Sequence, residues 1–237
     1  MFNEDSRVKI PAVLHIARLG YTYLSKKGNK WEKSNNIFPD IFAKSIEKIN
    51  PGISTGQIEN LKKEISLDLS NQDLGYQFYN KLVDSSGIKL IDFDNVENNT
   101  FNVLTELTYE KDDEEFRPDI TLLVNGIPLV FIEVKKPNNK DGILAEQNRL
   151  QSRFKNKKFL NFINITQLVI FSNNMEYDDE SHLPIEGAFY TTSSYKGSKL
   201  NYFREESHIN LNKILKNLSN DEEDFILKDN NIVSVKT

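Results

Sequence analysis

The sequence predicts an α/β protein in which a mixed central β-sheet is flanked by helices. Residues 117–136 hold two short apolar runs split by Asn125-Gly126, a strong signal for a two-strand hairpin. Residues 143–155 carry an apolar stripe at helical spacing, and residues 167–172 form a near-continuous apolar run, as in a buried strand. Because a strand–helix–strand connection is normally a right-handed crossover, we expect the strand at 167–172 to lie parallel to the second hairpin strand.

Helical stripes, caps and alternating runs predict the other elements. The first helix has Pro11 in its first turn and ends at Gly20, and a later helix has Ser54 or Thr55 as its N-cap. Further helices are expected at residues 40–50, 54–69, 73–84 and in part of 200–216; strands are expected at 88–93, 102–109 and 187–192, with a strand pair around a basic loop in 21–36. We assign residues 1–200 to one sheet domain with an N-terminal helical part, and residues 201–237 to a C-terminal helical segment.

Composition limits the classes of protein that this chain can be. Its 237 residues are 38% hydrophobic, which is enough for a substantial core in one domain. The lack of cysteine excludes disulfides and cysteine-metal sites, and three scattered histidines disfavour a zinc site. No apolar run has the length of a membrane span and no signal peptide precedes the first helix, so we expect a soluble, cytoplasmic protein without a membrane partner.

The hairpin carries the polar groups that suggest chemistry. Asp119 opens the first apolar run, and Glu133 and Lys135 close the second on one face of the strand. A two-residue loop would pair Asp119 with Ile132 and place it on the opposite face. A three-residue loop, 124–126, with a left-handed, bulged glycine would pair Asp119 with Phe131 instead. We expect this bulged register, which brings Asp119 to the face of Glu133 and Lys135.

These three side chains make a set suited to metal-dependent hydrolysis. A carboxylate and an ammonium inside an apolar strand are costly to bury unless they are paired or bound to metal. Hard oxygen ligands suit Mg²⁺, which polarises a phosphate and lowers the pKa of a bound water, and a lysine can stabilise the developing charge. The alternative is a surface hairpin on which Glu133 and Lys135 are simply solvated.

Charge is strongly segregated along the chain, although the net charge of −5 by itself does not suggest a nucleic-acid binder. Residues 106–119 hold seven acidic side chains, and residues 135–158 hold eight basic ones. The basic side chains that we expect to contact the phosphate backbone of DNA are Lys136, Arg149, Arg153, Lys155, Lys157 and Lys158. Alternatively, they form a solvated basic helix face.

Gln147 is a polar residue between the apolar positions of the helix at 143–155. The stripe otherwise consists of Ile143, Leu150 and Phe154. One explanation is that Gln147 faces the carboxylate site or the DNA backbone. The other is that it is an amide at the edge of the core that is hydrogen-bonded to the backbone.

Pro118-Asp119 followed by Glu133-Val134-Lys135 resembles the PD-(D/E)xK nuclease motif. The longer run RPDITLLVNGIPLVFIEVKKPN, the helix after it and QLVIFSNNMEY resemble the N-terminal domain of the restriction (R, HsdR) subunit of type I restriction–modification enzymes, over residues 4–195. The resemblance implies a restriction-endonuclease-like core and a Mg²⁺-dependent DNA endonuclease, in which Mn²⁺ can substitute. It implies Asp119 and Glu133 as metal ligands, Lys135 as the catalytic lysine and Gln147 as the first residue of the family's helix motif QxxxY.

The sequence departs from this family in two respects. Four residues after Gln147 stands Gln151 rather than tyrosine, which leaves open which glutamine belongs to the motif. No Gly-x₄-Gly-Lys-Ser/Thr phosphate loop or helicase motif is present, so we expect an N-terminal fragment of a longer R subunit, with ATP used only by the full-length protein. The expected partners are double-stranded DNA and, through the full-length subunit, the methylation and specificity subunits.

Two other functions stay open at this point. One is a standalone nuclease of the same fold, from DNA repair or a mobile element. The other is a catalytically silent DNA-binding module, which the intact Asp119, Glu133 and Lys135 disfavour. Glu4, ahead of the first helix, could help to hold the metal or could simply be an acidic residue at a helix N-terminus.

Overall fold

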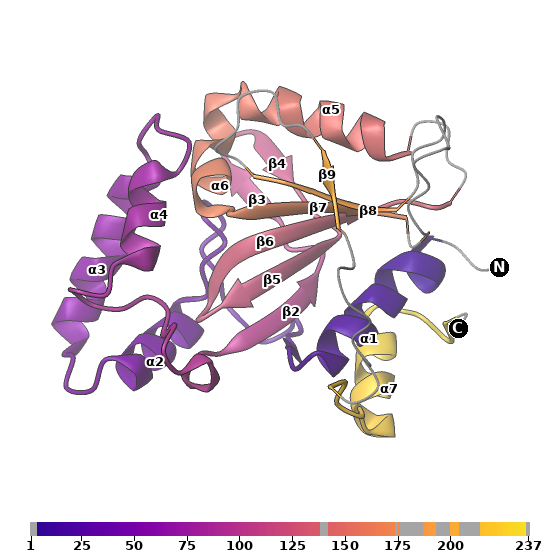
Figure 1. Ribbon diagram of the computed structural model, residues 1–237, viewed down its shortest axis with the longest axis horizontal. Coiled ribbons are helices and arrows are strands. Elements are labelled where there is room, and N and C mark those ends of the chain that lie inside the picture. Colours follow the sequence, from indigo (N-terminus) through magenta and orange to yellow (C-terminus); the bar gives the residue numbers. More distant parts are fainter. Residues whose placement is uncertain are drawn as a thin grey trace.

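The computed structural model describes residues 4–137, 142–173, 175, 187–192, 200–203 and 214–235. It confirms the mixed α/β architecture (Figure 1). Within these residues, seven strands form one sheet in the order β1-β2-β5-β6-β7-β8-β9. Their bounds are β1 (Thr22–Tyr23), β2 (Phe101–Thr105), β5 (Ile120–Val124), β6 (Ile127–Val134), β7 (Leu168–Ser172), β8 (Ala188–Thr191) and β9 (Asn201–Tyr202).

Strand directions follow the expected connections. β6 pairs with β7 in parallel, which confirms the crossover through the helix at 143–155. β2 runs antiparallel to β5, and β8 runs antiparallel to β7. β8 confirms the strand expected at 187–192. A separate two-stranded ribbon is formed by β3 (Tyr109–Lys111) and β4 (Glu114–Phe116), which carry much of the acidic segment.

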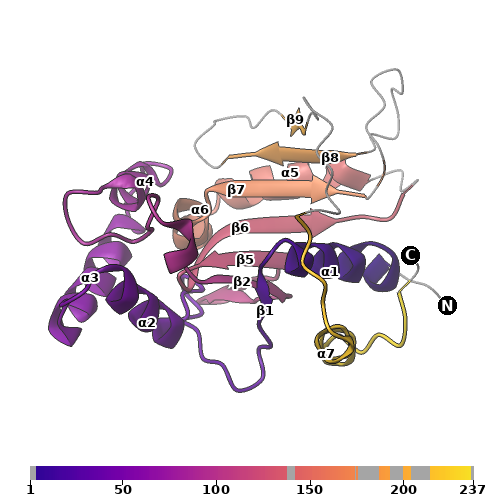
Figure 2. The ribbon, with the colours of Figure 1, turned by 60° about the horizontal axis from the view of Figure 1, so that its bottom comes forward.

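Helices cover both faces of the sheet and one of its ends. The pair α5 (Gly142–Phe154) and α6 (Leu160–Ile165) lies on one face, and α1 (Ile10–Arg18) lies on the other face together with α7 (Asn220–Asp229), as Figure 2 shows. At one end, a helical lobe consists of α2 (Pro39–Ile49), α3 (Thr55–Asp68) and α4 (Tyr76–Val83) (Figure 1). Short turns complete the set: η1 (Asp5–Lys9), η2 (Val96–Asn98) and η3 (Lys157–Phe159). None of the helices in the described part of the chain has the length and apolar character needed to span a membrane.

Both faces of the sheet are packed against helices by apolar side chains. Phe131 of β6 packs with Leu150 of α5 and Phe162 of α6 on one face. Val134 of the same strand packs with Val13 of α1 and Ile226 of α7 on the other face. The alternation along β6 therefore places Phe131 and Glu133 on the face that α5 covers, and Ile132 and Val134 on the face that α1 covers.

The hairpin turn differs from the expected one, although Asp119 still lies on the same face of the sheet as Glu133, as expected. The loop has two residues, because Val124 pairs with Ile127, and Asn125 and Gly126 both have positive φ values (53° and 78°). The bulge lies inside the strands instead: the register shifts between Leu122, opposite Val130, and Leu123, opposite Pro128. Thr121, not Asp119, is therefore opposite Phe131, and the expectation of a three-residue loop is wrong.

The strand expected at residues 88–93 is absent, and the segment is irregular. Side chains satisfy its backbone groups in place of a neighbouring strand. The Asp92 N–H donates to Asn99 Oδ1 at 2.9 Å, Asn99 Nδ2 donates to the Asp92 carbonyl, and the Lys89 N–H donates to Asn50 Oδ1 at 2.8 Å. Such local side-chain bonds compete with sheet pairing, which the apolar residues of this segment had suggested.

Two other strand predictions were too long. In 21–36 only β1 forms, because Ser25 and Asn29 make local bonds that turn the chain away after Tyr23. The strand expected at 102–109 ends at Thr105, since Glu106 has a left-handed conformation (φ 53°) and Tyr109 starts the separate ribbon. Within the expected helix at 200–216, residues 201–202 are β9, and residues 204–213 lie outside the described part.

Candidate active site

Asp119 and Glu133 meet where β5 begins beside the end of β6. Thr105 is opposite Ile120, and the Glu106 N–H donates to the Asp119 carbonyl at 3.0 Å, which extends the β2–β5 pairing by one residue. On the other side, the Val134 N–H donates to Asp119 Oδ2 at 2.9 Å. These bonds hold the Asp119 carboxylate against β6, beside Glu133, so the structure brings together the two carboxylates that the sequence paired.

Glu133 is a buried carboxyl group with an incomplete set of partners. Its exposed fraction is 7%, and Oε1 has no hydrogen-bond partner. Burial raises the pKa of Glu133 to about 9, and the charge of Asp119 and a hydrogen bond with it add to the increase. Without a cation at this place, the raised pKa keeps Glu133 protonated near neutral pH.

The raised pKa predicts how stability depends on pH in metal-free protein. The fold favours protonated Glu133, so the free energy of unfolding should fall as pH rises from about 4.5 toward about 9. Glu133→Gln should remove this loss and stabilise the protein by about 4–5 kcal/mol at pH 8, with little effect at pH 4. Urea unfolding at the two pH values, in the presence of a chelator, measures the difference. Glu115→Gln is the control, because Glu115 is exposed, and an equal gain for Glu133→Gln at pH 4 would contradict the prediction.

Lys135 lies beyond the last residue of β6 and points to the same region. Its N–H donates to the Ser172 carbonyl of β7 at 2.8 Å, which fixes the backbone. Its Nζ is 3.3 Å from Glu146 Oε1, and 18% of its side chain is exposed. Burial alone would lower the pKa of Lys135, but Glu146, then Asp119 and Glu133, more than offset this effect and raise it. Lys135 is therefore an ammonium group.

A pocket of about 430 Å³ is lined in part by Glu133 and Lys135. Its charged lining consists of Glu115, Arg117, Glu133, Lys135, Glu146, Arg149 and Arg153. The α5 side of the pocket is built by Glu146, Arg149 and Arg153, whose spacing places them on one flank of the helix. The lining therefore combines three carboxylates with four basic side chains, a mixture that can admit a cation and a phosphate together.

Gln147 does not line this pocket, and Glu146 does. At about 100° per residue, positions 146 and 147 fall on opposite flanks of the stripe made by Ile143 and Leu150. Glu146 is only 4% exposed and lies on the pocket flank, whereas Gln147 is half-buried on the other. Glu146 was not singled out from the sequence. It could have been, because positions 146 and 147 are three and four residues after Ile143 and border the apolar stripe equally well.

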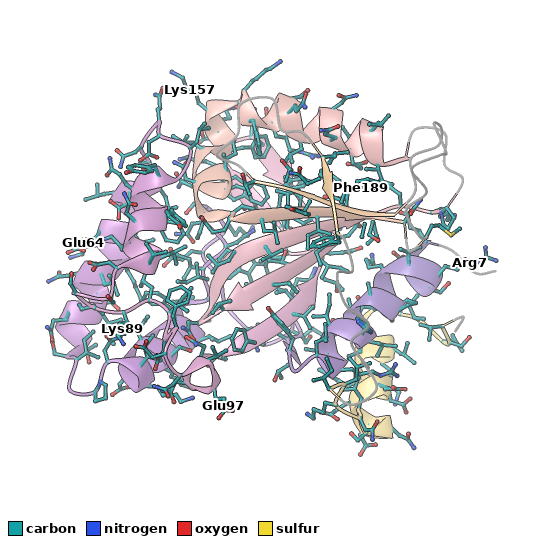
Figure 3. The ribbon with its side chains drawn as sticks, viewed as in Figure 1. Arg7, Glu64, Lys89, Glu97, Lys157 and Phe189 are labelled. Carbon is teal, nitrogen blue, oxygen red and sulfur yellow. The ribbon has the colours of Figure 1, made fainter. Side chains whose placement is uncertain are left out.

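The basic residues expected to bind DNA are not equally available. Arg153 lies 3.7 Å over the centre of the Phe116 ring, and burial lowers its pKa. Arg149 is paired with Glu146, and Lys158 with Asp113 of the acidic ribbon. The remaining members, Lys136, Lys155 and Lys157, are exposed, and Figure 3 shows Lys157 pointing outward near the end of α5. Glu4 is near the site, because its Oε2 accepts a bond from the Lys136 N–H at 2.9 Å.

Comparison with known proteins identifies the family. The sequence model described as type I restriction enzyme R protein N terminus (HSDR_N) matches residues 1–178. This chain belongs to that family. A relative from Methanocaldococcus jannaschii, named as the type I restriction enzyme MjaIXP endonuclease subunit, is 28% identical over 199 residues, which cover 73% of this chain and 19% of the relative. The MjaVIIP endonuclease subunit of the same organism is 51% identical over 47 residues, or 20% of this chain and 4% of that protein.

The HSDR_N chain spans less than a fifth of the length of the MjaIXP endonuclease subunit. A third relative, the MjaVIIIP endonuclease subunit, is 35% identical over 81 residues, or 33% of this chain and 8% of its own length. The family match extends from residue 1 to 178 and therefore includes Asp119, Glu133, Lys135 and Glu146. The pocket described above thus lies wholly inside the part of this HSDR_N chain that defines the family.

The two carboxylates of this HSDR_N domain fit a divalent cation of the Mg²⁺ type. Glu133 Oε1 is a buried oxygen without a hydrogen-bond partner, and the Asp119 carboxylate beside it adds to the increase in the pKa of Glu133. Mg²⁺ is commonly held by one or two carboxylates, with waters and substrate phosphate completing its shell. Among the residues that the structure describes, no group of three or more His, Cys, Asp or Glu is arranged as a complete protein-only metal site. Asp119 and Glu133 would therefore supply only part of the ligands.

Proposed function

We propose that this chain is the DNA endonuclease domain of a type I restriction enzyme R subunit, and that it hydrolyses phosphodiester bonds with Mg²⁺. The observation that carries the proposal is the adjacent pair Asp119 and Glu133, of which Glu133 lines a pocket together with Lys135 and three arginines. Family membership supports it, because the relatives are named as endonuclease subunits. Its substrate is double-stranded DNA, and its partners are the methylation and specificity subunits of the complex.

Each side chain has a distinct task in this proposal. Asp119 and Glu133 would hold Mg²⁺, which would polarise the scissile phosphate and acidify a bound water. Lys135 carries a positive charge at the pocket and would stabilise the charge that develops on the phosphate oxygens. Arg117 and Arg153 on the walls would attract the DNA backbone without reading its bases, so sequence recognition would belong to another subunit.

Calorimetric titration of Mn²⁺ into this chain, beside its Asp119→Ala variant, tests the metal site. Binding is expected in the wild-type protein, with release of a proton from Glu133, and at least a tenfold loss of affinity is expected in the variant. Repeating the titration in two buffers of different ionisation enthalpy measures the proton. Asp94→Ala is the matched control, since it removes an exposed carboxylate from the irregular segment after α4.

Duplex DNA is added if the chain alone takes up no Mn²⁺, because substrate phosphate can complete the coordination shell. Absence of Asp119-dependent binding under both conditions would refute a metal-dependent nuclease. Plasmid cleavage by the isolated chain, compared with cleavage by the longer R subunit in its complex, then separates a standalone nuclease from a domain that needs its partners. Efficient cleavage by the chain alone would favour the standalone enzyme.

A further inference from the structure

Glu146 is a buried acidic residue for which the proposed metal site gives no role. Its side chain is 5% exposed and projects from α5 into the pocket wall. Two cations contact it through the same oxygen, Oε1: Lys135 Nζ at 3.3 Å and an Arg149 guanidinium nitrogen. A buried carboxylate is tolerated where cations neutralise it, so this pairing explains how Glu146 stays in the wall.

The contact has a greater effect on Lys135 than on Glu146. The backbone of Lys135 is fixed by its bond to Ser172, but a four-carbon side chain reaching from the end of a strand has many rotamers. Glu146 lies on a regular helix whose stripe residues Ile143 and Leu150 are buried in the core. The backbone that carries the Glu146 carboxylate is therefore held in a fixed position against the sheet. The ion pair places the Lys135 ammonium 3.3 Å from this carboxylate, at the pocket that Glu133 also lines.

We propose that Glu146 is a positioning residue, which holds the Lys135 ammonium in place for the reaction and does not itself bind the metal. This inference rests on the proposed nuclease function and adds a residue to it. It also reassigns Arg149: because its guanidinium is bound to the oxygen that contacts Lys135, Arg149 supports Glu146 from the solvent side. Arg153, stacked on Phe116, is then the α5 arginine left to meet a phosphate.

Mobility of the Lys135 side chain is the direct test. In this chain labelled with ¹⁵N and ¹³C, the order parameter of the Lys135 Cε–Nζ bond is measured by NMR relaxation, with the signal assigned through its loss in Lys135→Arg. Wild-type Lys135 should be rigid, and in Glu146→Ala the order parameter should fall below about 0.6. Glu146→Gln, which keeps an acceptor of the same shape, should give an intermediate value.

A matched control distinguishes this effect from the general loss of an ion pair. Glu64→Ala removes the 2.9 Å partner of Lys81 in the helical lobe, and Figure 3 shows Glu64 at the outer surface of α3, far from α5. It should leave the order parameter of Lys135 unchanged. An unchanged Lys135 order parameter in both Glu146 variants would overturn the proposal.

Mn²⁺ titration and cleavage kinetics distinguish positioning from metal binding. Glu146→Gln should retain Mn²⁺ affinity within about fivefold, less than the tenfold loss expected from removing a ligand. The single-turnover cleavage rate of the R subunit at saturating DNA should fall at least tenfold, with DNA affinity unchanged. Loss of Mn²⁺ binding as complete as in Asp119→Ala would make Glu146 a ligand and refute the proposal. If wild-type protein binds no Mn²⁺ even with DNA, the nuclease function fails, while the NMR result still decides whether Glu146 orders Lys135.

Discussion

Replacing Lys135 with alanine is expected to lower the single-turnover rate of DNA cleavage by about 10²–10³-fold, with folding and Mn²⁺ binding retained. The reason is that its side chain is largely buried and its ammonium group is close to the carboxylates that would hold the metal. In such surroundings a fixed positive charge stabilises developing negative charge far more than it would in bulk water. The side chain is 18% exposed and ends at the pocket, so its removal leaves no large cavity in the core.

The measurement is cleavage of plasmid DNA at saturating Mg²⁺ and DNA by an R subunit that contains this chain, in its complex. Lys136→Ala is the control, because it removes the same charge one residue later from an exposed side chain. This control should weaken DNA affinity slightly and leave the rate at saturation within about twofold. Equal rates for Lys135→Ala and wild type would refute the role of Lys135. A rate that recovers at higher DNA concentration would assign Lys135 to binding instead of chemistry.

Replacing Gly126 with alanine is expected to destabilise the fold by about 3 kcal/mol or more. Gly126 has φ +78°, which a residue with a Cβ rarely adopts, and that change alone costs about 1 kcal/mol. In addition, a Cβ would lie 2.7 Å from the Phe42 nitrogen and 2.9 Å from the Phe38 carbonyl oxygen. Both atoms are backbone atoms at the start of α2, where the Phe38 N–H also donates to the Gly126 carbonyl at 3.0 Å. The hairpin tip and the helix would have to separate, with further loss of packing.

Gly52→Ala separates the two contributions to the Gly126 effect. Gly52 has a similar φ of +88°, and a Cβ there would meet no atom within 4 Å. Its substitution should therefore cost about 1 kcal/mol, through backbone strain alone. Urea unfolding of both variants measures the difference, with unchanged m-values as the condition for comparison. Equal losses would mean that the hairpin tip does not depend on its close contact with α2.

The sequence by itself determined the elements that depend on local chemistry. Asn125-Gly126 specified a hairpin, because both residues tolerate the left-handed conformation that a two-residue turn requires. Ser54, one of the two expected N-caps, does cap α3, and the apolar run at 167–172 indicated a buried strand, which pairs in parallel with β6. The nuclease motif and the family followed from residues that are close in sequence, and the family was confirmed.

Only the tertiary structure decided which polar groups meet at the pocket. The bulge that brings Asp119 to Glu133 lies between Leu122 and Leu123, where it depends on packing between strands rather than on the turn. Glu146 and Gln147 are equally compatible with the helical stripe. The rotation of α5 about its axis, which packing on the sheet sets, places Glu146 rather than Gln147 in the pocket lining. Backbone propensities act between neighbours in sequence, whereas strand register and helix rotation are set by contacts between distant segments, which a local pattern does not contain.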